Sequence, residues 1–213
     1  MGCSIAAVKH KTQPICAGRQ HRSLNSRPSI TFTDAISRLD LNERQIFQLQ
    51  QSWKAISRKM EYTGINMFIR IFETHADLKK FFFMVENCTT IAEMRESKGL
   101  AKHVLMVMNT LDDTIYNLND MQYVIDLLYD IGKQHRTFSD FRREFFLRKA
   151  LPRKEKWLES VTEPFLLAVK ETLGDRYTRN MATVYRRLIQ FVIANIFQGF
   201  GDVSTDKKKI QDG

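Results

Sequence analysis

The feature that most constrains the fold is a helical spacing of apolar residues that begins near Asn42 and continues to Gly199. Apolar side chains recur at intervals of three, four and seven residues, which places them on one face of an α-helix. The segments with this spacing are residues 43–58, 62–76, 98–117, 121–135, 157–173 and 178–199. No alternating apolar and polar run and no hairpin dipeptide indicates a strand. The sequence therefore predicts an all-α domain.

Two of the predicted helix boundaries carry a recognisable signal. Asn42 followed by Gln45 is typical of a capping box that opens a helix, and Gly174 is typical of a helix stop. Pro164 interrupts the segment 157–173 and leaves two alternatives. Either a helix begins late, with the proline in its first turn, or a longer helix kinks at that residue.

The connecting segments differ in character. Residues 77–83 predict a short helical turn, and residues 84–97 predict a corner with irregular structure. The stretch 136–156 is basic and aromatic, and it predicts a loop that could include a helical turn.

Composition divides the chain of 213 residues into three parts. Hydrophobic residues make up 43% of the chain, which is enough for a buried core. Residues 1–39 lack helical periodicity and carry basic residues with no acidic residue before Asp34, so they predict a disordered basic arm. Residues 40–200 form the predicted domain, and residues 201–213 form a short tail.

The apolar runs argue against a membrane-spanning helix, and the cysteines argue against a disulfide-stabilised or zinc-binding fold. The longest apolar runs, 81–85 and 165–169, are far shorter than the roughly 20 residues that cross a bilayer. The three cysteines, Cys3, Cys16 and Cys88, are too few and too scattered for a disulfide framework and contain no C-x-x-C zinc motif. A reducing compartment fits this pattern best.

The net charge of +9 does not by itself indicate a nucleic-acid partner. Nucleic-acid binding would need aromatic residues interleaved with the basic clusters, or a known motif, and neither is present. The chain also lacks a glycine-rich phosphate loop, an H-E-x-x-H motif and a G-x-S-x-G motif, so hydrolase and phosphotransferase activity have no support. We expect no enzyme activity.

Two histidines lie on the apolar faces of consecutive predicted helices. His103 follows Leu100 by three residues, and His135 follows Ile131 by four. A single histidine on such a face is most often a hydrogen-bonded core residue. Two on consecutive helices favour an iron site, because neutral imidazole is a common iron ligand.

Aromatic residues are dense in the part of the chain that precedes the predicted helix of His103. Such density suits the apolar slot that a haem needs, although it is also typical of an ordinary core. The candidates for this lining are Phe68, Phe72, Phe81, Phe82 and Phe83.

Five stretches resemble the globin family, in particular its neuroglobin-like branch, which includes membrane-tethered, N-acylated members. They are residues 52–56 (SWKAI), 63–72 (TGINMFIRIF), 76–82 (ADLKKFF), 102–107 (KHVLMV) and 131–136 (IGKQHR). The resemblance extends over about residues 42–199. The segment after His135 is longer than is usual in the family, and Pro164 falls where a family helix usually runs.

The resemblance implies a globin fold of seven to eight helices around a haem, iron protoporphyrin IX. It implies that His135 is the proximal iron ligand and that His103 faces the iron from the distal side. It also implies that Phe68 and Val107 line the distal pocket and that Phe82 packs against the haem face.

Three functions remain open at this point. If His103 ligates the iron directly, gas binding is slowed and redox sensing or electron transfer to a partner is favoured, which is the function that the neuroglobin-like resemblance indicates. If His103 instead hydrogen-bonds a gas, the chain stores or transports O2, and NO or CO would bind similarly. The third alternative is a globin-like regulatory module without haem.

The first residues predict lipid attachment. Met1-Gly2-Cys3-Ser4 suits N-myristoylation of Gly2 and palmitoylation of Cys3, although Ala6 stands where the myristoylation pattern has Ser or Thr. A second acyl chain and a basic arm together supply the signals that stable anchoring needs. The alternatives are an unmodified tail and a mitochondrial presequence. We expect the cytoplasmic face of a membrane if the chain is acylated, and otherwise the cytosol or, less well supported, the mitochondrion.

Overall fold

The computed structural model describes residues 38–136 and 154–201, and within them every regular element is a helix. The prediction of an all-α domain is confirmed. None of the helices in these two ranges is long and apolar enough to cross a membrane. The segment 137–153, the tail after Gly201 and nearly all of the predicted arm, with Gly2 and Cys3, lie outside the described residues.

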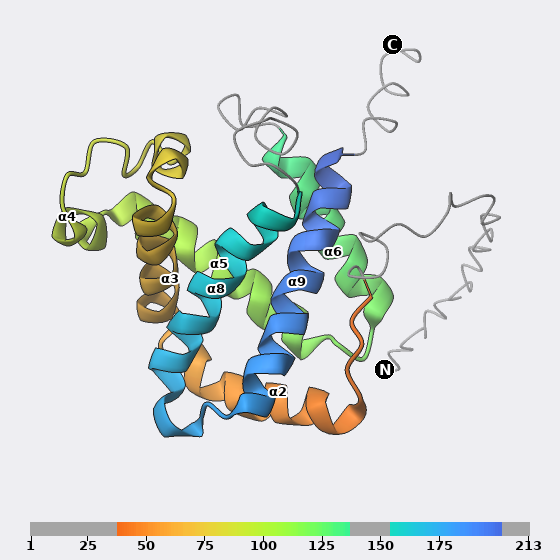
Figure 1. Ribbon diagram of the computed structural model, residues 1–213. Helices are drawn as coiled ribbons and strands as arrows, with labels where there is room; N and C mark the ends of the chain where they lie inside the picture. The colour runs from red at the N-terminus through yellow and green to blue at the C-terminus, as the bar shows by residue number, and fades with distance from the viewer. Residues whose placement is uncertain (1–37, 137–153, 202–213) are drawn as a thin grey trace, which may run out of the picture.

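The helices pack around one core, as Figure 1 shows. In chain order they are α2 (Glu43–Ser57), α3 (Met60–Thr74), the 3₁₀ helix η1 (Ala76–Phe81), α4 (Ile91–Glu96), α5 (Lys98–Tyr116), α6 (Met121–His135), α8 (Lys154–Leu173), the 3₁₀ turn η2 (Gly174–Arg176) and α9 (Arg179–Gly201). The most extensive packing joins α6 to α9, followed by α3 with α8 and α3 with α5. In Figure 1, α8 and α9 run side by side, and α2 lies across one end of the pair.

The first helix begins at the predicted capping box. The side chain of Asn42 accepts a hydrogen bond from the backbone of Gln45 at 2.9 Å, and the side chain of Gln45 accepts one from the backbone of Asn42 at 3.1 Å. One face of α2 then buries Trp53, whose indole N–H donates to the carboxylate of Asp112 on α5 at 2.7 Å. This hydrogen bond therefore joins α2 to α5.

Pro164 does not delay the start of α8. The helix begins at Lys154 and continues through the proline to Leu173, so the longer helix is the correct alternative. Proline leaves the carbonyl four residues earlier without its helical donor. Phe165 and Ala168 are completely buried where α8 packs on α3 and α9, and this burial offsets the cost. Gly174 ends the helix with a φ of 55°, as predicted.

The corner at residues 84–97 is more regular than the sequence prediction. Its second half forms α4, because Thr90 and Glu93 make a capping box in which Thr90 Oγ1 accepts from the backbone of Glu93 at 3.1 Å. Met94 is buried beneath it. The pattern is the same one that marks Asn42, so the sequence did contain the signal for this helix.

Candidate functional site

His103 lies on α5 with its ring among aromatic side chains. The ring centroid is 5.3 Å from that of Phe68 and 5.5 Å from that of Phe82, and both contacts are edge-to-face. The helix is held in place on either side of the histidine by Leu100 and Val104, which are completely buried. The imidazole therefore points into an apolar, aromatic space.

The surroundings of His103 keep its imidazole neutral. Burial, and then repulsion from a positive charge on His135, lower the pKa of His103 to about 4. The two side chains are therefore near enough to interact electrostatically. At neutral pH the ring of His103 has one nitrogen with a lone pair, which is the form that binds a metal.

His135 is the last residue of α6. Its Nδ1 lies 2.8 Å from the backbone carbonyl of Ile131. A carbonyl can only accept a hydrogen bond, so Nδ1 donates, and the lone pair of the neutral ring is on Nε2. A second-shell bond of this kind sets the tautomer and the ring direction of a metal-ligating histidine.

Three phenylalanines form the aromatic side of the site. Phe68 lies 6.0 Å from Phe72 and 5.6 Å from Phe82, and Phe72 lies 5.1 Å from Phe82. Val107, one turn after His103, packs against the same core and is half-buried. Phe72 was only one of several aromatic candidates, and its place four residues after Phe68 is the signal that puts it on the same helix face.

The prediction that Phe83 lines the site is wrong. Its side chain is 77% exposed, while Phe82 one residue earlier joins the aromatic cluster. Phe81 lies under the ammonium group of Lys80, 5.0 Å from its ring centroid. The backbone leaves helical geometry at Phe82, directly after η1, and this change of direction decides which ring turns inward.

The donor set suits a haem better than a metal held by protein alone. Within residues 38–136 and 154–201, no group of three or more His, Cys, Asp or Glu side chains could hold a metal. Two imidazoles alone would not complete the coordination of iron, so His103 and His135 would hold an iron whose remaining ligands a porphyrin would supply. The apolar rings of Phe68, Phe72 and Phe82 match its flat hydrocarbon face.

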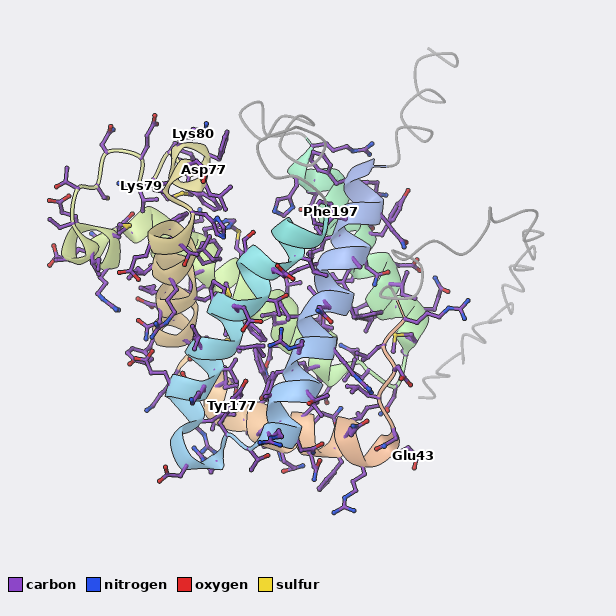
Figure 2. All side chains as sticks on the ribbon, viewed as in Figure 1. Glu43, Asp77, Lys79, Lys80, Tyr177 and Phe197 are labelled. Carbon is purple, nitrogen blue, oxygen red and sulfur yellow. The ribbon has the colours of Figure 1, made fainter. Side chains whose placement is uncertain are left out.

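The site lies toward the end of the fold where η1 and the ends of α6 and α9 are found. Figure 2 shows Lys79, Lys80 and Phe197 toward this end, and Glu43 and Tyr177 toward the other. Lys79 Nζ donates to the backbone carbonyl of Cys88, which ties η1 to the corner before α4.

Comparisons with known proteins agree with this geometry. The family model for globins matches residues 65–150, a range that includes both histidines. Neuroglobin of Dissostichus mawsoni is 25% identical over 167 residues, which cover 78% of this chain and 97% of the relative. Cytoglobin-2 of Danio rerio is 25% identical over 155 residues, 73% of this chain and 80% of the relative.

A solved structure is similar over a comparable length. The crystal structure of a hexacoordinated heme protein from an anhydrobiotic tardigrade, at pH 4, has a TM-score of 0.66 with this chain and 25% sequence identity. The similarity covers 77% of this chain and 97% of that one.

The all-helical fold, the aromatic surroundings of His103 and the position of His135 at the end of the next helix define a helical protein suited to haem. The chain has a globin fold and is similar to globins, and these similarities support haem as its cofactor.

Proposed function

We propose that this globin holds its haem iron between His135 and His103 and acts in redox sensing or electron transfer. The observation that carries the proposal is that the ring of His103 packs against Phe68 and Phe82, with His135 near enough to interact with it electrostatically. A neutral imidazole needs no loss of a proton before it ligates iron. The tardigrade protein of similar fold is likewise described as hexacoordinated.

Each residue has a separate task in this proposal. His135 presents Nε2, because the bond from Nδ1 to the carbonyl of Ile131 sets the tautomer and restricts rotation of the ring. Phe68 and Phe82 pack edge-to-face against the ring of His103 and surround it with apolar groups. When bound, haem supplies an iron that changes between ferrous and ferric states and binds diatomic gases.

The contacts of His103 favour a redox role over gas storage. An external gas would have to displace a ring that two aromatic side chains already hold in place. A ligand pair that stays the same in both oxidation states needs little rearrangement when an electron is transferred. In the alternative, reversible O2 storage or transport, the N–H of the neutral His103 ring would donate to bound O2.

The visible spectrum of the purified full-length ferrous protein tests the proposal. We expect sharp low-spin bands without any added ligand, and a broad high-spin spectrum in His103→Leu. A broad high-spin spectrum in the unmodified protein would contradict ligation by His103 and favour gas storage. A chain that takes up no haem on reconstitution would favour the haem-free regulatory module.

We also propose that acylation of Gly2 and Cys3 brings this haem to a membrane surface. The support is the sequence of the first residues alone. The test compares the membrane-bound fraction of the full chain with that of Gly2→Ala, using Ser4→Ala as the matched control. An equal membrane fraction in Gly2→Ala and Ser4→Ala would contradict acyl anchoring.

A further inference from the structure

Two glycines lie where α6, the helix of His135, crosses α9. Gly132 on α6 and Gly199 on α9 are both buried where these two helices cross. Each glycine faces the backbone of the other helix. The α6–α9 crossing is also the most extensive helix contact in the described part of the chain.

No side chain fits at either position. A Cβ atom on Gly132 would overlap the carbonyl oxygen of Ile196 and lie 2.8 Å from the backbone nitrogen of Phe200. A Cβ atom on Gly199 would overlap the carbonyl oxygen of Tyr129 and lie 2.7 Å from its carbonyl carbon. The obstacle is backbone in both cases, so no rotamer change could make room.

The crossing lies directly before the proximal histidine. Gly132 precedes His135 by three residues and follows Ile131, whose carbonyl accepts the hydrogen bond from the imidazole. Residues three apart in a helix lie on neighbouring parts of the same side. A displacement of α6 at Gly132 would therefore move the imidazole and its hydrogen-bond acceptor together.

The corresponding contact on the side of His103 is different. A Cβ atom on Gly64 of α3 would overlap Cγ1 of Val104 and lie 2.9 Å from Cγ of Met108, both on α5. These obstacles are side-chain atoms, of which those of Met108 belong to a flexible side chain and that of Val104 to a stiff one. The α3–α5 contact is therefore made by side chains, whereas the α6–α9 contact is made by backbone.

We propose that Gly132 and Gly199 are positioning residues that hold His135 in place by keeping α6 in backbone contact with α9. The proposal rests on the haem-ligating role of His135, but it does not require His103 to be a ligand. A larger residue at either glycine separates α6 from α9 and displaces the imidazole of His135. Alanine forms helix better than glycine, so any loss cannot come from helix propensity.

The test uses full-length, haem-loaded protein that carries His103→Leu, so that His135 is the axial histidine. Gly132→Ala and Gly199→Ala are compared with Gly201→Ala, whose added Cβ meets nothing within 4 Å. We expect a lower iron–imidazole stretching frequency in the resonance Raman spectrum of the first two. We also expect haem transfer to a scavenger protein to be about tenfold faster, the size of a second-shell loss. Values equal to those of Gly201→Ala would overturn the proposal.

A second comparison separates positioning from general damage to the fold. In His135→Gly loaded with free imidazole, the axial ligand is no longer tied to α6. Adding Gly132→Ala there should leave the iron–imidazole band unchanged. A shift of the same size as with His135 present would mean that the glycine acts through the pocket as a whole and would overturn the proposal.

If the alanine variants do not fold, hydrogen exchange of the haem-loaded wild-type protein decides the question. Slower exchange of the amides near Gly132 and Gly199 than of those near Gly64 supports the proposal, and equal or faster exchange overturns it. A low-spin or high-spin spectrum of the wild type decides the role of His103 separately. The failure of one proposal can therefore be told from the failure of the other.

Discussion

The two sides of the site are built by different kinds of contact. On the side of His135, α6 meets α9 backbone to backbone at Gly132 and Gly199. On the side of His103, α5 meets α3 through side chains, and the histidine packs edge-to-face against Phe68 of α3. Backbone on backbone leaves no side chain that could rearrange, whereas the atoms that face Gly64 belong to side chains, of which Met108 has several rotatable bonds and Val104 is stiff. We therefore expect α6 to be held more rigidly at Gly132 than α5 is at Gly64.

The largest effect expected from this difference is on haem retention. His135→Ala should weaken haem binding more than about 100-fold, because it removes the ligand itself where a second-shell change alone costs 10- to 100-fold. His103→Ala should keep the haem, since the opposite ligand remains. Haem titration measures both, with His75→Ala as the control. Equal losses in His135→Ala and His103→Ala would remove the distinction between the two sides.

Truncation of an aromatic side chain at the site should strongly lower the free energy of unfolding. Phe68 is buried and touches Phe72, Phe82 and His103. Phe68→Ala should lower the free energy of unfolding by about 3–5 kcal/mol, as is usual for a large core truncation. The exposed Phe83→Ala should change it by less than about 0.5 kcal/mol. Denaturant unfolding compares the two, and similar losses would contradict the inward direction of Phe68.

A third test concerns the hydrogen bond from Trp53 on α2 to Asp112 on α5. Asp112→Ala removes the acceptor of the Trp53 indole N–H and leaves a buried donor unpaired. We expect a loss of about 1–3 kcal/mol in the free energy of unfolding. Asp113→Ala is the neighbouring control, because the partners of Asp113 are the exposed Tyr123 and the half-buried Asn117. A loss no larger than that of the control would show that the indole bond does not hold α5.

The smallest expected effect concerns Glu171 on α8, whose hydrogen bonds reach α3, and this effect depends on pH. The hydroxyl of Tyr62, and then Arg70, lower the pKa of Glu171. Because the folded pKa is below the unfolded value of about 4.3, this stabilisation is present above that pH and is lost as the pH falls through the folded pKa. The group is exposed, so the effect should be under about 1 kcal/mol. Glu171→Gln should flatten the acid limb of the stability curve, while Glu159→Gln should not.

Local signals in the sequence were enough for the helices and for the choice of histidines. Apolar spacing places the helices, and the pair Asn42 and Gln45 marks where the first begins, because capping depends only on residues three apart. The same signal at Thr90 and Glu93 predicts α4, although we had expected an irregular corner there. The positions of His103 and His135 on apolar stripes also follow from spacing alone.

The remaining features depend on contacts between residues far apart in the chain. Among the adjacent phenylalanines, Phe82 packs on Phe68 and Phe72 of α3, whereas Phe83 is exposed. Packing on α3 and α9 keeps α8 helical at Pro164, although proline disfavours the interior of a helix. The sequence by itself determined that two histidines would lie on consecutive amphipathic helices. Only the tertiary structure decided that the helix of His135 is held by backbone at Gly132, because a glycine in the sequence does not show what approaches it.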